Sequence, residues 1–61
     1  MNNELMNLKE VAKYLNMSTH TVYRMTMPTA KRPIPHFKIG GALRFSLNKV
    51  NEWLSEMEVL A

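Results

Sequence analysis

The stretch NLKEVAKYLNMSTHTVYR (residues 7–24) decides the fold, because it encodes two helices separated by a very short turn. Asn7 and Glu10 have the Asn-x-x-Glu spacing of a capping box, which predicts a helix that begins after Asn7. Asn16 tolerates the left-handed conformation that ends many helices, so this helix is predicted to stop near Leu15-Asn16. Apolar residues recur along it with the spacing of one helical face: Leu8, Val11, Ala12 and Leu15.

A second helix is predicted over residues 19–26, with Ser18 as its N-cap. At about 100° per residue, Val22, Met25 and Thr26 share one side of this helix. The other side carries polar or bulky residues, namely His20, Tyr23, Arg24 and Met27. Two helices joined by so short a turn are typical of a helix-turn-helix, the alternative being the αα-hairpin of any small bundle. The polar outer face favours the helix-turn-helix, because a helix that is merely soluble usually carries Glu and Lys there.

A loop follows from Met27 to Pro35, since three prolines exclude a helix or a central strand. This loop carries the basic pair Lys31-Arg32, which stands between two candidate contact elements. The next stretch, FKIGGALRF (37–45), contains Gly40-Gly41, the pair that a two-residue hairpin turn favours. Strands are therefore predicted over residues 36–39 and 42–45.

Alternation along these strands separates two faces of the hairpin. We expect the apolar residues Phe37, Ile39, Leu43 and Phe45 to face the core. Lys38 and Arg44 are then expected to share the outer face. An isolated pair of strands is barely stable in water, so the hairpin must pack on the helices or meet a partner.

A third helix is predicted to begin at Ser46, which can act as its N-cap. Its apolar stripe consists of Leu47, Val50, Leu54 and Met57, with Trp53 and Leu60 beside it. Trp53 is the largest apolar side chain and is expected to anchor the core. The predicted core contains Leu8, Val11, Ala12, Leu15, Val22, Leu43, Leu47, Val50, Trp53 and Leu54, while Met6, Met17 and Met57 are expected to fill gaps.

The chain of 61 residues is predicted to form a single domain, with residues 1–6 as a loose N-terminal tail. It contains no Cys, which excludes a disulfide framework and a thiolate zinc site and fits a reducing cytoplasm. No apolar run approaches the roughly 18 residues of a membrane span. The N-terminus lacks the basic and apolar regions of a signal peptide.

The charges are distributed unevenly, although the net charge is only +3. Between Glu10 and Glu52 there is no acidic residue. The same interval contains seven basic residues: Lys13, Arg24, Lys31, Arg32, Lys38, Arg44 and Lys49. A basic middle between acidic ends predicts one electropositive face and a polyanionic partner.

Catalysis finds no support in the sequence, and neither an enzyme activity nor a cofactor is expected. The chain has no Asp, no Cys and no Gly-rich phosphate loop. His20 and His36 lack the further ligands that a metal site would need, so no metal is expected.

The predicted order of elements is helix, turn, helix, hairpin and helix. With this order, the chain resembles the excisionase and AlpA-like small DNA-binding proteins, whose winged helix-turn-helix is similar to the DNA-binding domain of MerR regulators. The resemblance is carried by three stretches: NLKEVAKYLNMSTHTVYR (7–24), IPHFKIGGALRF (34–45) and LNKVNEWL (47–54). It implies a mainly α fold with one small β-hairpin, the wing.

The resemblance also implies which residues contact DNA. The second helix of the family enters the major groove, which implicates Thr19, His20, Thr21, Tyr23 and Arg24. Ser18 joins them, because hydroxyls and amides at a helix N-terminus suit a phosphate. The wing of the family lies along the backbone or minor groove, which implicates Lys38, Gly40, Gly41 and Arg44. The basic loop pair, Lys31 and Arg32, completes the predicted interface.

The function implied by the resemblance is that of an excisionase, or recombination directionality factor. Such a protein binds repeated sites in double-stranded DNA cooperatively, bends the DNA and assists an integrase in excising a mobile element. The expected setting is a bacterial or phage-encoded protein in the cytoplasm, at the nucleoid. Two alternatives stay open: a transcriptional regulator of prophage or developmental genes with the same fold, and a protein-interaction module that binds an acidic partner.

Overall fold

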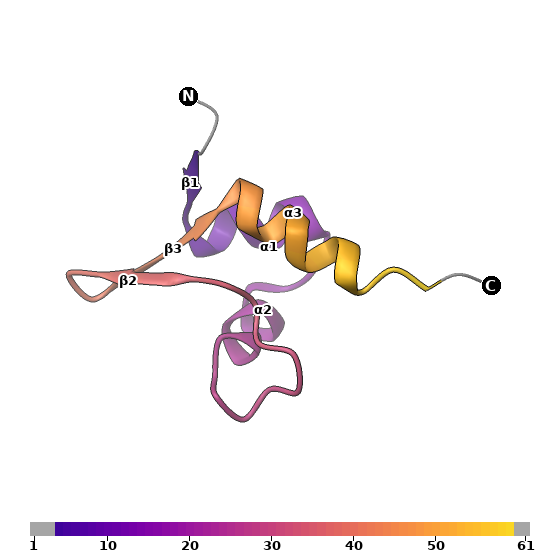
Figure 1. Cartoon of the computed structure of the whole chain (residues 1–61). Coiled ribbons are helices and arrows are strands. Elements are labelled where there is room, and N and C mark those ends of the chain that lie inside the picture. The colour runs from indigo at the N-terminus through magenta and orange to yellow at the C-terminus, as the bar shows by residue number, and fades with distance from the viewer. Residues whose placement is uncertain (1–3, 60–61) are drawn as a thin grey trace.

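The computed structural model describes residues 4–59 and shows three helices and a small antiparallel sheet (Figure 1). The elements in chain order are β1 (Leu5–Met6), α1 (Leu8–Leu15), α2 (Thr19–Met25), β2 (Phe37–Ile39), β3 (Ala42–Ser46) and α3 (Leu47–Glu56). This is the predicted winged helix-turn-helix, with the hairpin of β2 and β3 as its wing. Within the described residues, each helix is too short or too polar to cross a membrane.

The helix-turn-helix is defined by local hydrogen bonds at the helix ends. The Asn7 amide donates to Glu10 Oε1 (2.9 Å), and the Glu10 amide donates to Asn7 Oδ1 (2.8 Å), which completes the predicted capping box. Asn16 ends α1 in the left-handed conformation (φ 58°), and Ser18 Oγ accepts from the Thr21 amide (3.1 Å) to start α2. The predicted turn is confirmed. It could be predicted because its caps are interactions between residues close together in the sequence.

The sheet has a third strand that the sequence did not predict. Its order is β1-β3-β2, and Leu5 and Met6 pair with Ser46 and Phe45. The carbonyl of Glu4 also accepts the Leu47 amide (3.1 Å). The prediction of a loose tail is therefore wrong for Leu5–Met6, because a strand this short is defined by distant pairing and not by a local pattern. Residues 1–3 of the predicted tail lie outside the described residues.

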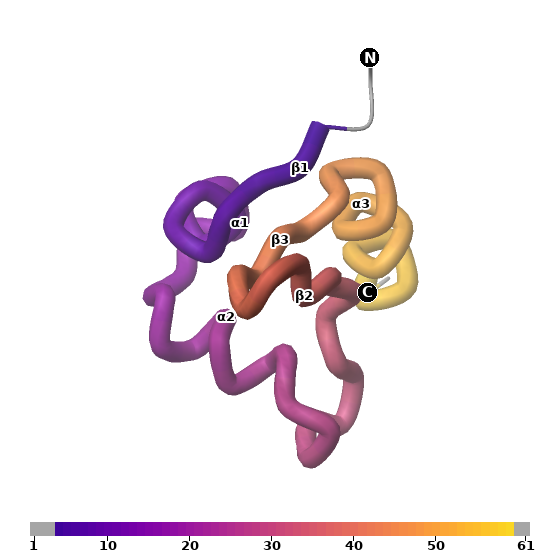
Figure 2. The backbone as a smooth tube through the Cα atoms, turned by 90° about the vertical axis from the view of Figure 1, so that its left-hand side faces the viewer, coloured from indigo at the N-terminus to yellow at the C-terminus, as the bar shows by residue number. Residues whose placement is uncertain are grey.

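The core lies where α1, α2, β3 and α3 meet, and Figure 2 shows β3 passing between α1 and α3. Its buried apolar residues are Val11, Ala12, Val22, Ile34, Phe45 and Val50. Partly buried residues pack around them: Met6, Leu8, Leu15, Met25, Leu43 and Trp53. Ile34 is a core residue that the sequence did not predict, because a single apolar residue between two prolines has no periodicity to reveal it. Its amide donates to the Met25 carbonyl (2.9 Å), which draws the end of the loop onto α2.

Outside the hairpin, three of the apolar residues that the structure describes are less buried than predicted. Leu54 and Met17 are 36% and 39% exposed, so neither belongs to the core. Trp53 packs at the core's edge, where its Nε1 donates to the Arg32 carbonyl (3.3 Å) and ties α3 to the loop. The indole needs a polar partner for its N–H, which favours this edge position. Leu60, expected beside the α3 stripe, lies outside the described residues.

The two faces of the hairpin differ from the prediction. Phe45 is fully buried, but Phe37 and Ile39 are 39% and 55% exposed. The cause is the register: Phe37 pairs with Arg44, and Lys38 pairs with Leu43. Residues directly opposite in an antiparallel pair share a face, so Lys38 lies with Leu43 and not with Arg44.

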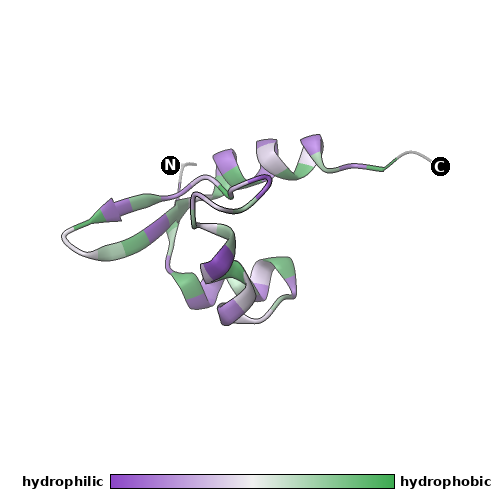
Figure 3. Ribbon diagram, turned by 90° about the horizontal axis from the view of Figure 1, so that it is seen from below, coloured by the Kyte–Doolittle hydropathy of each residue, from purple (hydrophilic) through white to green (hydrophobic). Residues whose placement is uncertain are grey.

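Both faces of the wing consequently carry one positive and at least one apolar side chain. Figure 3 shows the wing projecting beyond the helices with apolar residues in both of its strands. Gly40 (φ 57°) and Gly41 (φ 85°) form its turn, as predicted, and two consecutive positive φ angles are what a type I′ turn requires.

Candidate nucleic-acid interface

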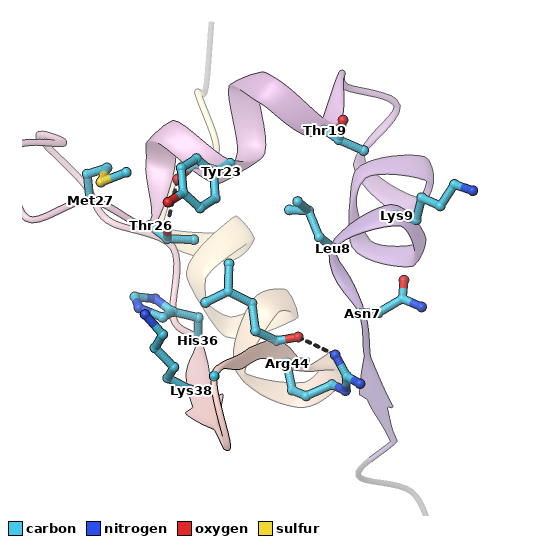
Figure 4. Close-up of a pocket in the computed structure, with 12 residues that line it drawn as sticks. Asn7, Leu8, Lys9, Thr19, Tyr23, Thr26, Met27, His36, Lys38 and Arg44 are labelled. Carbon is cyan, nitrogen blue, oxygen red and sulfur yellow. Dashed lines mark hydrogen bonds between the residues drawn. The ribbon is translucent and has the colours of Figure 1, made fainter.

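An open groove of about 710 Å³ lies between α2, the wing and the first residues of α1 (Figure 4). It is lined by Asn7, Leu8, Lys9, Thr19, Tyr23, Thr26, Met27, His36, Lys38, Gly41, Leu43 and Arg44. Three of these residues are cationic at neutral pH, four others offer hydroxyl or imidazole groups, and none is a carboxylate. This composition suits an anionic ligand with many acceptor oxygens.

The α2 wall of the groove is positioned by burial of the adjacent side of the helix. Val22 is fully buried in the core, so the side chains about 180° away from it point to solvent. His20 and Arg24 occupy this exposed ridge, while Thr19 and Tyr23 lie toward the wing and line the groove. Tyr23 is 44% exposed, which leaves its hydroxyl and ring edge accessible.

The other flank of α2 faces the loop. Thr21 and Arg24 line a second hollow together with Met25, Met27, Thr29 and Ala30. Arg24 therefore lies on the exposed ridge and also borders this hollow. Its side chain is exposed to solvent and accessible to a ligand on either side.

The wing wall is formed by Lys38, Leu43 and Arg44, with His36 directly before β2. Arg44 Nη1 donates to the Leu43 carbonyl (2.7 Å), and the side chain is partly buried. This bond leaves the other guanidinium N–H groups for a ligand. Gly41 lines the groove, whereas Gly40 is exposed at the turn.

Two predicted contact residues lie elsewhere, because the loop packs against α3. Arg32 Nη1 donates to the Glu56 carbonyl (3.5 Å), and Trp53 Nε1 bonds to the Arg32 carbonyl. Neither Arg32 nor its neighbour Lys31 lines the groove. Ser18, also predicted, is occupied as a cap: its hydroxyl accepts from the Thr21 amide and donates to Thr21 Oγ1 (2.8 Å).

The groove also contains polar residues that the sequence interpretation left out, namely Asn7, Lys9, Thr26 and His36. The sequence shows that Lys9 lies off the apolar stripe of α1. That it lies near the wing depends on the tertiary structure and has no sequence signal. His36 could have been found by alternation, since it stands two residues before Lys38. Among residues 4–59, no group of three or more potential ligands gathers around either histidine or elsewhere to hold a metal.

Comparison with known proteins agrees with this geometry. No curated protein and no solved structure matches the chain. The family model described as "Helix-turn-helix domain" matches residues 5–58, which include every helix and strand described above. Helix-turn-helix domains bind DNA by placing their second helix in the major groove. The chain therefore belongs to the helix-turn-helix domain family, and this membership indicates double-stranded DNA as its partner.

Proposed function

We propose that the protein binds specific DNA sequences with α2 in the major groove and the wing against the adjacent backbone or minor groove. The observation that carries this proposal is the groove between α2 and the wing, which has basic and hydroxyl side chains and no carboxylate in its lining. A duplex whose major groove receives α2 brings a sugar-phosphate strand to the neighbouring wing. In this proposal, that strand occupies the groove between these elements.

The roles of individual residues follow from their positions. Arg24, on the exposed ridge of α2, can donate two hydrogen bonds to guanine O6 and N7. His20 and Thr21 flank it and reach base edges or phosphates, while Thr19 and Tyr23 meet the strand in the groove. Lys38 and Arg44 contact phosphates from the wing, and the Gly40-Gly41 turn lets the backbone approach closely.

The biological role proposed is that of an excisionase that assists an integrase on a mobile element in the bacterial cytoplasm. This finer role is supported by the likeness of the three sequence stretches to excisionases. A single module buries only about 600–1,000 Å², so affinity for one site is modest and adjacent copies are expected to bind cooperatively. The exposed acids Glu52, Glu56 and Glu58 give a neighbouring copy or the integrase an oppositely charged surface.

Footprinting on the DNA that flanks the protein's own gene tests the proposal. We expect protection of several repeated sites, with log affinity falling linearly with log salt by about 0.9 per phosphate neutralised. In a reconstituted reaction with the integrase, the protein should raise excision and lower integration.

The same experiments separate the alternatives. Absence of any complex at low salt, on native flanking DNA and on random DNA, would contradict DNA binding and favour an acidic protein partner. A footprint confined to a promoter, with no effect on the integrase, would favour a transcriptional regulator.

A further inference from the structure

His36 occupies a position in the groove that the proposed residue roles do not use. It directly precedes β2 and lines the groove together with Lys38, two residues later on the same side of the strand. Figure 4 shows both residues on the hairpin side of the groove, below Thr26, the C-cap of α2. A phosphate strand that enters the groove therefore passes the imidazole.

The His36 ring is held by two contacts that do not involve a ligand. Its Nδ1 lies 2.9 Å from the Ile34 carbonyl oxygen, and its ring packs against buried Phe45 with centroids 6.4 Å apart. Ile34 and Phe45 are both core residues, 1% and 0% exposed. The imidazole is consequently positioned by the core, which lowers the entropy cost of using it in binding.

The contact with Ile34 also fixes the chemistry of the ring. A carbonyl oxygen only accepts hydrogen bonds, so Nδ1 must carry a proton. In the neutral ring Nε2 is then a hydrogen-bond acceptor, which a phosphate oxygen cannot satisfy. In the imidazolium ion Nε2 carries a proton and can donate a charge-assisted hydrogen bond to phosphate.

The charged and titratable groups around the groove include no negative partner for the imidazolium. The side chains that share the groove with His36 are Lys38 from β2, Arg44 from β3, Lys9 from α1 and Tyr23 from α2. No carboxylate lines it that could serve as the internal partner of an imidazolium. Glu52 and Glu56 of α3 line a separate hollow with the neighbouring Pro35. Within the groove, a phosphate of the ligand would supply the negative charge that stabilises the protonated ring.

We propose that DNA binding is coupled to protonation of His36, which takes a proton from the solvent and donates Nε2–H to a backbone phosphate. The proposal rests on the proposed DNA-binding function and deepens it. It predicts that affinity for DNA rises as pH falls through the neutral range. It also assigns this dependence to one of the two histidines of the chain.

The other histidine provides a matched control. His20 lies exposed on the ridge of α2 and does not line the groove. His36→Gln and His20→Gln remove one imidazole each and replace it by the same neutral amide. In His36→Gln the amide nitrogen takes roughly the place of imidazole Nε2, so it can still donate to a phosphate, but without taking up a proton.

The experiment measures affinity for a footprinted site between pH 6 and pH 8 at constant ionic strength, by fluorescence anisotropy of labelled DNA. The wild type should bind more tightly at lower pH, by at most about tenfold per pH unit, the limit for one linked proton. His20→Gln removes a contact proposed for α2, so it should bind more weakly at every pH but keep this dependence. His36→Gln should lose this dependence. Titration calorimetry of the wild type at pH 7, in buffers of different ionisation enthalpy, should show proton uptake on binding.

The proposal is overturned by wild-type binding that does not change with pH, by calorimetry without proton uptake, or by a pH dependence that persists in His36→Gln. Loss of the pH dependence in His20→Gln would equally contradict it. In each of these cases the protein still binds DNA, so the proposed function stands. Absence of binding at every pH would contradict the proposed function and this inference together.

Discussion

The helix α2 and the wing form two walls of one groove, but the core holds them in different ways. α2 is anchored along its length, with Val22 fully buried and Met25, together with the C-cap Thr26, half-buried on the same side. The wing is anchored at its base, where Phe45 is buried, while all three residues of β2 are exposed. A helix fixed along its length suits base recognition, whereas a hairpin fixed at one end suits backbone contacts that tolerate adjustment.

The largest expected effect separates the anchored base of the wing from its free part. Phe45→Ala should cost about 3–5 kcal/mol, because it empties a fully buried ring site. This is comparable to the total stability of a domain of this size, so the variant should be largely unfolded. Phe37→Ala makes the same chemical change at a side chain 39% exposed and should cost less than about 1 kcal/mol.

Urea unfolding followed by circular dichroism measures both variants. Equal destabilisation would show that Phe37 is packed as tightly as Phe45. That outcome would contradict the exposure of Phe37 in the structure.

The second prediction compares an arginine from each wall. Arg24→Ala should weaken binding by about 1–3 kcal/mol and blur sequence preference at one base position. Arg44→Ala should weaken binding to all sequences alike and reduce the salt dependence by about one phosphate. Affinity measured on a set of single-base variants of the site, at several salt concentrations, distinguishes the two. If Arg44→Ala weakened binding only at one base position, the wing would also recognise bases, which would contradict the proposed difference between the two walls.

The third prediction concerns the turn of the wing. Gly41→Ala should destabilise the protein by about 1–2 kcal/mol, since its φ of 85° is unfavourable for a residue with a Cβ. No atom lies within 4 Å of the added Cβ, so the cost is conformational and not steric crowding. Gly40→Asn should be nearly neutral, because it creates the Asn-Gly pair preferred in type I′ turns. Asn16 already adopts φ 58° in this chain.

Thermal unfolding of the two glycine variants provides the measurement. If Gly40→Asn proves as harmful as Gly41→Ala, the turn requires more than positive φ angles. Close approach of another group to Gly40 would then be the explanation to test.

The smallest expected effect concerns Lys9, in the first turn of α1 at the edge of the groove. Lys9→Ala and Lys13→Ala remove one charge each from the same helix, but only Lys9 lines the groove. Lys9→Ala should therefore lower the slope of log affinity against log salt by about 0.9, the value for one phosphate contact. Lys13→Ala should leave the slope nearly unchanged. If Lys9→Ala and Lys13→Ala gave equal slopes, the lysines of α1 would act only through long-range attraction of DNA and not through a phosphate contact of Lys9.

Much of the fold could be predicted because its signals are local. Asn7, Glu10 and Ser18 define helix starts within three or four residues, and Gly40-Gly41 defines the wing's turn. The faces of the wing could not be predicted in the same way from apolar residues alone. A two-residue turn at Gly40-Gly41 pairs Lys38 with Leu43, which puts Lys38 and Arg44 on opposite faces. The predicted turn was therefore incompatible with the prediction that Lys38 and Arg44 share a face.

The candidate site was predictable in part for a related reason. The exposed side of α2 followed from its helical period, and its residues are exposed as expected. Lys9 and His36 meet the groove only because α1 and β2 pack on either side of it, and no local pattern encodes that arrangement. Lys31 and Arg32 show the reverse: neither lines the groove, and Arg32 contacts α3 instead.

The hydrogen bond from the Leu47 amide to the Glu4 carbonyl makes the start of α3 depend on the beginning of the chain. Amides in the first turn of a helix have no acceptor within that helix, so this one would otherwise exchange rapidly with solvent. Hydrogen exchange at this single amide should therefore report whether the first strand is docked against the sheet.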